Sequence, residues 1–241
     1  MATVDKLIAG ARFLGFDLSR GQVAQFEAYY RALIDWNHRI NLTAITAYED
    51  VQTKHFLDSL TVALATPDVR EEPLNMIDVG TGAGLPGLPL KIAFPQLRLV
   101  LLEATAKRAA FLRSIAGLLE LDGVEVVAGR AETVAHQPQY REHFALVLSR
   151  AVAALPALVE LTLPFCAVGG RLVALKQADA MPEVDHAARA ITLLGGRLRQ
   201  VIAVNVPGLP PDRRLVVVDK VAPTPADYPR RPGVPAKRPL H

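Results

Sequence analysis

The chain has 241 residues, of which 51% are hydrophobic and 21% charged, so it can bury a sizeable core and wholesale disorder is excluded. Its single cysteine, Cys166, excludes an internal disulfide, and no apolar run approaches the roughly 20 residues that a membrane-spanning helix needs. We therefore expect a cytoplasmic protein. The formal net charge of +3 is small, but the first 73 residues are acidic and the last 21 are basic, so a polyanion is expected to meet the later part of the chain.

The first 70 residues have the pattern of helices. Ser19 and Gln22 match a capping box, and apolar residues follow at helical spacing as far as Ile40. A second periodic run begins at Tyr48, contains the stretch "KHFLDSL" and stops before Pro67. We interpret residues 1–70 as a helical N-terminal extension.

From Leu74 onward, short apolar runs alternate with helical ones. This alternation predicts an α/β fold, a doubly wound parallel sheet with helices on both faces. The last two strands are joined by "PGLPPD", which leaves no room for a crossover helix, so they should form an antiparallel hairpin. The expected strands are 74–79, 97–103, 124–129, 144–151, 169–177, 197–206 and 213–221, and the expected helices begin near 88, 105, 155 and 181.

The last stretch, residues 222–241, is rich in proline and basic residues. Prolines favour an extended arm, and extended cations suit contact with an RNA backbone, although the same composition is equally typical of a disordered terminus. The candidate RNA-binding residues of this tail are Arg230, Arg231, Lys237 and Arg238.

The stretch "DVGTGAGLPG", from Asp78 to Gly87, follows the first strand of the sheet. Its Gly80, Gly82 and Gly84 mark a nucleotide-binding corner, because glycine is needed where a Cβ would strike a ligand. Asp78 ends the strand, where a carboxylate is awkward beside a pyrophosphate but suits a ligand carrying an ammonium and a sulfonium. Asp78 and the terminal hairpin therefore favour S-adenosylmethionine over NAD as the cofactor.

Two further carboxylates follow the next strands. Glu103 ends the second strand, where a carboxylate accepts hydrogen bonds from ribose hydroxyls. Glu132 follows the third strand in "AGRAE", with the backbone of Ala131 beside it, near the expected adenine edge. We expect Glu103, Ala131 and Glu132 to bind the adenosine part of the cofactor, although Glu132 could also be the first-turn acid of a surface helix.

The loop after the fourth strand, "SRAVAALPAL", should face the methyl acceptor. It lacks the [DN]-P-P-[YF] pattern of enzymes that methylate exocyclic amines, and Cys166 lies outside it, in a position typical of core packing. No histidine–carboxylate pair indicates a general base. A purine N7 needs none, so positioning could suffice for catalysis, and Arg150 at the strand end is the candidate catalytic residue, oriented toward the acceptor. A salt bridge to a neighbouring carboxylate is the alternative role for Arg150.

Other basic residues could contact RNA along the later part of the chain. Lys176 should lie on the rim of the site because it ends the fifth strand. His55 and Asp58 share a helix face, where we favour a buried hydrogen-bonded pair over half of a metal site, and we expect no metal. The remaining candidates are Lys107, Arg108, Arg130, Arg197 and Arg199.

Seven motifs together resemble the bacterial small-subunit rRNA guanine-N7 methyltransferase family, also called glucose-inhibited division protein B. The motifs are "NLTAI", "HFLDSL", "IDVGTGAGLPGLPL", "AGRAE", "LSRAVA", "LVALKQ" and "YPRRPGVPAKRPL". The resemblance implies a Rossmann-like class I methyltransferase sheet over residues 71–221, and methyl transfer from S-adenosylmethionine to a guanine N7 in 16S rRNA. Carried over by motif, the residues that contact the cofactor are Gly80, Leu85, Ala131, Glu132 and Arg150, so that Arg150 would touch the methionine carboxylate as well as, or instead of, the base.

Three other functions are compatible with parts of this pattern. A small-molecule S-adenosylmethionine methyltransferase would use the helical front as a lid. A dinucleotide-binding oxidoreductase or sensor would use the same glycine-rich corner. A non-catalytic RNA-binding module would use only the basic residues. For the leading interpretation we expect 16S rRNA or the small ribosomal subunit as the partner, no membrane, and a monomer.

Overall fold

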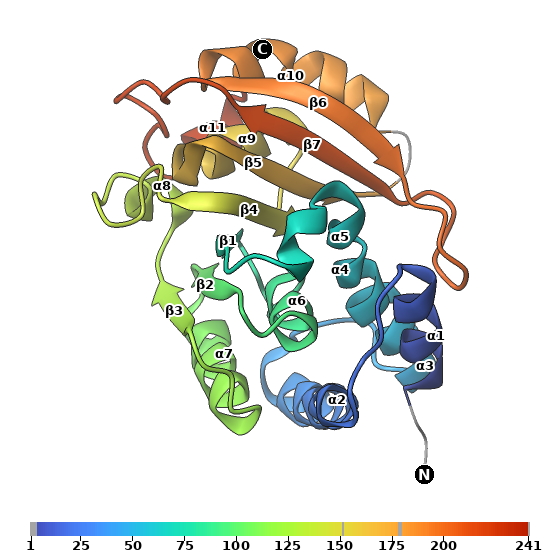
Figure 1. Ribbon diagram of the computed structural model, residues 1–241. Coiled ribbons are helices and arrows are strands. Elements are labelled where there is room, and N and C mark those ends of the chain that lie inside the picture. Colours follow the sequence, from blue (N-terminus) through green and yellow to red (C-terminus); the bar gives the residue numbers. More distant parts are fainter. Residues whose placement is uncertain (1–3, 151, 178–179, 241) are drawn as a thin grey trace.

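A computed structural model describes residues 4–150, 152–177 and 180–240 (Figure 1). It contains a seven-stranded sheet with the order β3-β2-β1-β4-β5-β7-β6, in which β7 runs antiparallel to β5 and to β6. The expected doubly wound sheet with a terminal antiparallel hairpin is therefore confirmed. The strands are β1 Asn75–Val79, β2 Arg98–Glu103, β3 Val124–Ala128, β4 Phe144–Arg150, β5 Cys166–Lys176, β6 Gly196–Ala203 and β7 Arg214–Lys220.

Helices cover both faces of the sheet, and Figure 1 shows α10 on one side and α2 on the other. One face carries α6 Gly87–Ala93, α7 Ala106–Leu118 and the N-terminal helices, and the other carries α8 Ala131–Val134, α9 Leu155–Thr162, η3 Leu163–Phe165 and α10 Met181–Leu193. The N-terminal helices are α1 Asp5–Phe13, α2 Arg20–Ile40, α3 Tyr48–Val51, η1 Gln52–Leu57, α4 Asp58–Leu60, α5 Val62–Ala65 and η2 Pro67–Arg70. Among the described residues no helix is long and apolar enough to cross a bilayer.

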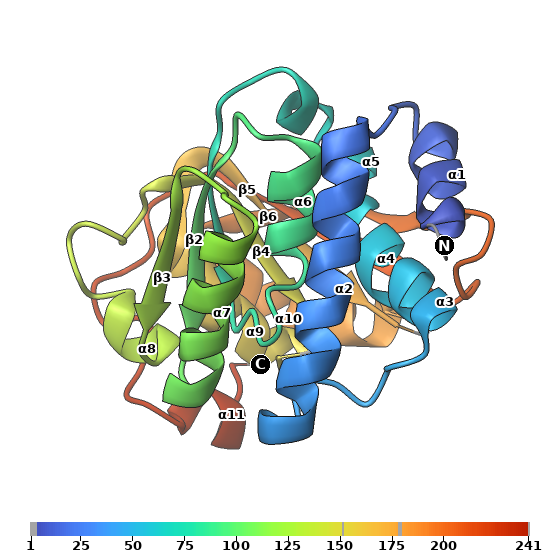
Figure 2. The same ribbon diagram turned by 90° about the horizontal axis from the view of Figure 1, so that it is seen from below.

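The N-terminal helices share one hydrophobic core with the sheet. Phe26 and Tyr29 of α2 are fully buried, and both stack on Phe56 of η1. The capping box expected at the start of α2 is present, because Ser19 and Gln22 exchange hydrogen bonds. The Gln22 side chain also donates to the carbonyls of Ile92 and Ala93, which joins the start of α2 to α6 of the sheet domain. Figure 2 shows α2 lying across α6 and beside α7.

The register of the sheet brings parts distant in sequence to one edge. Strands β1 to β5 are parallel, so the segments that follow them gather at their carboxyl ends, where ligands of such folds bind. Strand β7 is antiparallel, and its first residue, Arg214, lies opposite Lys176 at the end of β5. The segment that enters β7 therefore contributes to the same edge as the glycine loop.

The tail differs from the extended arm expected from its composition. It contains a short helix, α11 Val234–Lys237, and it lies against the sheet domain, where Tyr228 and Leu240 pack on the core. Arg230 is ion-paired with Glu160 of α9, a residue 70 positions away along the chain. The composition of the tail alone cannot indicate a partner that lies so far away along the chain.

Candidate functional site

The glycine loop turns sharply between β1 and α6. The N–H groups of Gly80 and Thr81 both donate to the carbonyl of Leu102, which holds the loop against β2. Gly80 has φ +70°, and a Cβ there would lie 2.6 Å from a methyl carbon of Val152. Gly82 has φ +59°, and a Cβ there would meet no atom within 4 Å. Both positions therefore require glycine for backbone reasons, and the space beside Gly82 is open to a ligand.

Two buried carboxylates fasten this loop. The Asp78 Oδ2 accepts hydrogen bonds from the Thr81 hydroxyl at 2.6 Å and from the Gly87 N–H at 2.8 Å. The Glu103 Oε2 accepts from the Gly82 N–H at 3.0 Å, and its Oε1 accepts from the Thr105 N–H at 2.8 Å. Glu103 is thus where a ribose-binding carboxylate was expected, and it also supports the loop. Asp78 is fully buried, and its Oδ1 has no hydrogen-bond partner among the described residues, so its observed contacts shape the loop from behind.

A tyrosine from the N-terminal extension completes the support of the loop. The buried Tyr29 hydroxyl donates to the carbonyl of Ala83. A Cβ added at Gly84 would lie 2.8 Å from the same hydroxyl oxygen, so this glycine makes room for Tyr29. Leu85 packs in the core and its N–H donates to the Thr81 carbonyl, so the structure uses Leu85 to build the loop. Sequence reasoning missed Tyr29, because its helical spacing marks it only as a core residue.

A first cavity of about 240 Å³ lies beside the glycine loop. Its walls are largely apolar, and its polar residues are Arg130 and Glu132. Burial raises the pKa of Glu132, but hydrogen bonds from the Gly233 N–H, its own N–H and Arg130 outweigh burial and hold the pKa below its usual value. The cavity is lined by Val79, Gly80, Leu102, Ala104, Gly129, Arg130, Ala131, Glu132, Val152, Ala153, Leu161 and Ala236.

The first cavity fits a nucleoside cofactor without phosphates. Its lining includes one cation, Arg130, which is already ion-paired with Glu132 at 3.3 Å, so a pyrophosphate would meet no free positive charge there. Apolar walls suit an adenine ring, and the open side of Gly82 leaves room for a substituent. Of the expected cofactor-binding residues, the structure brings Gly80, Ala131 and Glu132 to this lining.

A second cavity of about 410 Å³ lies at the ends of β4 and β5, and its Lys176 contacts Ala153 of the first cavity's lining. Arg150 lines it, donates to the Lys54 carbonyl, and is ion-paired with Asp58 at 3.2 Å. Arg213 is ion-paired with the other oxygen of Asp58, also at 3.2 Å. Lys176 donates to the Ala153 carbonyl and to Glu183. The cavity is lined by Ile45, Lys54, His55, Asp58, Arg150, Leu175, Lys176, Gln177, Glu183 and Arg213.

His55 and Asp58 do not form the pair that their spacing suggested. His55 Nδ1 lies 3.1 Å from the Lys54 carbonyl and Nε2 lies 2.8 Å from the Thr43 hydroxyl, while Asp58 is held by the two arginines. Burial, helped by the charge of Arg150, lowers the pKa of His55 to about 4. A carbonyl can only accept, so Nδ1 donates to it and the Nε2 lone pair accepts from Thr43. His55 is therefore neutral and its lone pair is already used.

The chain is similar to known proteins in both sequence and fold. Residues 22–216 match the family described as rRNA small subunit methyltransferase G, GidB. The chain belongs to this family. A relative named ribosomal RNA small subunit methyltransferase G from Dehalococcoides mccartyi strain CBDB1 is 54% identical over 237 residues, which cover 98% of this chain and all of that protein. A relative of the same name from Roseiflexus sp. strain RS-1 is 50% identical over 238 residues, covering 99% of this chain and all of that protein.

The sheet is also that of class I methyltransferases. The solved structure of a SAM-dependent methyltransferase from Aquifex aeolicus has a TM-score of 0.53, covers 75% of this chain and 97% of its own, and is 13% identical. That likeness concerns the fold alone, and it agrees with the expected fold. The expected family is confirmed by the match over residues 22–216. No group of three or more metal-ligating side chains occurs within residues 4–150, 152–177 and 180–240.

The expected basic residues outside the two cavities lie in three parts of the chain: the start of α7, strand β6 and the tail. Lys107 and Arg108 begin α7, so they lie at the same sheet edge as the glycine loop. Arg197 of β6 lies opposite Asp219 of β7, and Asp219 lies opposite Arg171 of β5. Arg171 in turn lies opposite Leu146, near the beginning of β4, so Arg197 is far from the sheet edge that carries the glycine loop. Arg230 is held by Glu160, whereas three tail cations are exposed without an ion pair among the described residues: Arg231, Lys237 and Arg238. Cys166 is buried in the core as expected, and burial raises its pKa to about 12.

Arg213 and Lys54 are site residues that sequence reasoning missed. Arg213 immediately precedes β7, and the expected antiparallel hairpin already implied that this strand begins at the carboxyl edge of its neighbours. Lys54 lies in the motif "KHFLDSL", but no local pattern indicates that this helix reaches the second cavity.

Removing the Tyr29 hydroxyl tests its support of the glycine loop. We expect Tyr29→Phe to leave the Ala83 carbonyl without its donor, at a cost of about 1 kcal/mol, and to weaken binding of S-adenosylhomocysteine by about fivefold. Isothermal titration calorimetry measures the affinity. Tyr30→Phe is the matched control, because that hydroxyl bonds the Thr46 carbonyl at the surface. Equal affinities of the two variants would contradict the role given to Tyr29.

Burial of Asp78 predicts a particular pH dependence of stability. Burial raises the pKa of Asp78 from 3.8 to about 6, against hydrogen bonds from Thr81 and Gly87. A carboxyl whose pKa is higher in the folded chain than in the unfolded chain stabilises the fold at pH values below the unfolded pKa. This contribution is lost as the pH rises through the folded pKa. Asp78→Asn removes this titration, so its free energy of unfolding relative to the parent chain should rise by about 3 kcal/mol between pH 4 and pH 7.

Urea unfolding at a series of pH values measures this difference. Asp185→Asn, at an exposed position on α10, is the control and should show no such trend. Stability curves of Asp78→Asn and the parent chain that stay parallel from pH 4 to pH 7 would refute the assignment.

Proposed function

We propose that this chain transfers a methyl group from S-adenosylmethionine to N7 of a guanine in the rRNA of the small ribosomal subunit. One observation carries the proposal: a cationic second cavity adjoins the glycine-loop cavity, and the side chains in its lining that could act as a general base are all committed to other partners. The membership of the methyltransferase G family supports the substrate class.

The first cavity would hold the cofactor. Gly80, Ala131 and Glu132 lie in its lining, and Glu103 and Asp78 fix the loop from behind. When bound, S-adenosylmethionine supplies an electrophilic methyl group on a positively charged sulfur. The residues of the chain supply position and an apolar surrounding, which converts an encounter of two molecules into an oriented contact.

The second cavity suits an acceptor that reacts without losing a proton. Among the described lining residues, His55 already uses its lone pair, Asp58 is paired with two arginines, and Glu183 accepts from Lys176 and the Leu155 N–H. None of them is free to act as a general base. A guanine N7 carries an available lone pair, whereas an amino or hydroxyl group would need deprotonation. The absence of a free base in this lining therefore favours N7.

The arginines of this cavity can orient a guanine. Guanidinium groups donate to the acceptor atoms of the guanine edge and to phosphates. A donor on N7 would block the lone pair, so we propose that Arg150 and Arg213 donate to O6 and to the adjoining phosphate and leave N7 free. Arg150 then acts on the acceptor, as first expected. The exposed cations near the same edge extend this surface for RNA: Lys107, Arg108, Arg130, Arg231, Lys237 and Arg238.

The modified base itself provides the direct test. Borohydride and aniline cleave RNA at N7-methylguanine, so primer extension on 16S rRNA from cells lacking the protein should lose one stop that the parent strain shows. The purified chain with labelled S-adenosylmethionine should restore that stop on the deficient rRNA or subunit. An unchanged set of stops, or turnover on free metabolites alone, would refute the proposal.

Substitution of Arg213 separates acceptor binding from cofactor binding. Arg213→Ala should lower kcat/KM for rRNA by about 100-fold, because it removes a donor and leaves Asp58 with a single partner. Its affinity for S-adenosylhomocysteine should stay within threefold of the parent chain, since Arg213 lines the second cavity only. The neighbouring Arg214, which bonds the Pro211 and Arg213 carbonyls, is the matched control for the substitution. A loss confined to cofactor affinity would contradict this placement.

A further inference from the structure

The C-terminal strap, defined here as residues 228–238, reaches the cofactor cavity. Ala236 of the strap lines that cavity together with Gly80, Gly129 and Glu132. We propose that the strap is a wall of the cofactor site and that Arg230 is a positioning residue, whose ion pair with Glu160 holds this wall in place. The inference rests on the proposed function, because that function assigns the first cavity to S-adenosylmethionine.

The ion pair between Arg230 and Glu160, called the clasp below, combines backbone and side-chain hydrogen bonds. The Arg230 backbone N–H donates to Glu160 Oε1 at 2.8 Å, its Nε donates to the same oxygen at 2.9 Å, and its Nη2 donates to Oε2 at 2.6 Å. Glu160 is fully buried and lies on α9, whose Leu161 lines the cavity. Arg230 Nη2 also donates to the Arg238 carbonyl at 2.7 Å, which closes the strap on itself. A buried carboxylate depends on such a partner, so the clasp is the energetically favoured state of the strap.

A second attachment joins the strap directly to the cavity lining. The Gly233 N–H donates to Glu132 Oε1 at 2.8 Å, and Gly233 has φ +83°, a conformation that suits glycine. His136 Nε2 lies 2.8 Å from the Pro229 carbonyl. Glu132 was expected to face the cofactor, and in the structure the strap holds it. The position of the strap therefore fixes both the far wall and the carboxylate of the cavity.

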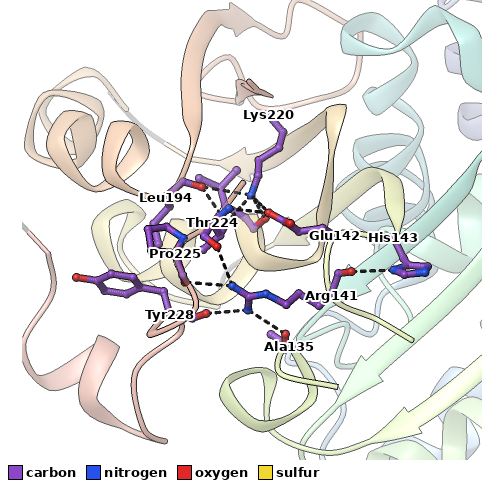
Figure 3. A network of polar contacts seen from close by, with 10 residues as sticks. Ala135, Arg141, Glu142, His143, Leu194, Lys220, Thr224, Pro225 and Tyr228 are labelled. Atoms are coloured by element: carbon purple, nitrogen blue, oxygen red, sulfur yellow. Dashed lines mark hydrogen bonds and ion pairs between the residues drawn. The ribbon is translucent and has the colours of Figure 1, made fainter. Parts of the chain in front are cut away.

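The root of the strap is fixed by a buried polar network (Figure 3). Arg141 donates to the carbonyls of Tyr228, Thr224 and Pro225. The fully buried Lys220 is ion-paired with Glu142 at 2.9 Å, and Glu142 accepts from the Thr224 N–H at 2.6 Å. This network constrains the chain as far as Tyr228, and beyond it the clasp, the Gly233 N–H and the contact between His136 and Pro229 hold the strap. Loss of the clasp would thus loosen the cavity wall without releasing the root.

Substitution of Arg230 tests this arrangement in the full chain. Arg230→Ala should weaken binding of S-adenosylhomocysteine, measured by isothermal titration calorimetry, by about tenfold. Without the clasp the cavity wall would become ordered only when the ligand binds, and the conformational entropy lost in that step reduces the free energy of binding. Arg230→Lys should restore part of the affinity, since an ammonium keeps one of the side-chain contacts. Arg189→Ala, an exposed arginine on α10 without an ion pair among the described residues, should leave the affinity unchanged.

The ligand-free melting temperature separates positioning from folding. A purely structural clasp would lower the melting temperature of Arg230→Ala and leave the dissociation constant of the folded protein at the parent value, and that result would overturn the proposal. If Arg230→Ala fails to fold, Ala236→Phe decides, because the exposed Ala236 tolerates a larger side chain that fills the cavity. We expect at least a tenfold loss of affinity, and parent-like binding would overturn the inference. A parent chain that binds no S-adenosylhomocysteine would instead refute the proposed function.

Discussion

One buried carboxylate allows two arginines to converge at the acceptor edge of the sheet. Asp58 comes from the N-terminal helices, Arg150 ends β4, and Arg213 precedes β7. Burial raises the pKa of Asp58, and the charges of Arg150 and Arg213 oppose that effect, so the two guanidinium groups stabilise the charged form of this buried carboxylate. Without Asp58, two cations would face each other in a half-buried space. The second cavity exists in its present form because this ion triad joins three separate parts of the chain.

The same interaction explains why the helical front belongs to the site. Lys54, His55 and Asp58 line the second cavity, and Tyr29 supports the glycine loop next to the first. The helices that carry these residues bury their apolar faces in the core of the sheet domain. The segments η1 and α4, which carry Lys54, His55 and Asp58, are too short to be stable alone in water, so packing on the sheet is what places these side chains. The boundary near residue 70 therefore divides the sequence pattern, but the second cavity takes its lining from both sides of it, and the glycine loop beside the first cavity is supported by Tyr29.

Local patterns predicted the parts of the site that lie within one strand–loop–helix unit. The glycine loop, Glu103, Ala131, Glu132 and Arg150 all follow a strand of the parallel sheet, and the sheet edge is a consequence of strand direction. Residues whose role depends on register or on distant packing could not be found in that way. Arg197 illustrates the limit, because it is basic and on a strand, yet the antiparallel register places it at the other end of the sheet.

The tail shows the same limit in its composition. Prolines and cations are typical of an extended arm, but one cation, Arg230, has a buried acid as its partner, and Glu160 looks like any helix residue in the sequence. The neighbouring Arg231, Lys237 and Arg238 remain exposed. One short segment thus carries a structural cation and three surface cations, and only the fold distinguishes them.

The two cavities are not independent, because Arg150 at the end of β4 lines one of them and residues 152–153, shortly after it, line the other. Arg150 lines the second cavity, whereas Val152 and Ala153 line the first. Lys176 lines the second cavity, and its ammonium group donates to the Ala153 carbonyl at 2.9 Å. A Cβ at Gly80 would strike Val152, so the glycine loop and this wall are in close contact. Lys176, in the lining of the proposed acceptor cavity, therefore also holds the backbone of Ala153 in the wall of the proposed cofactor cavity.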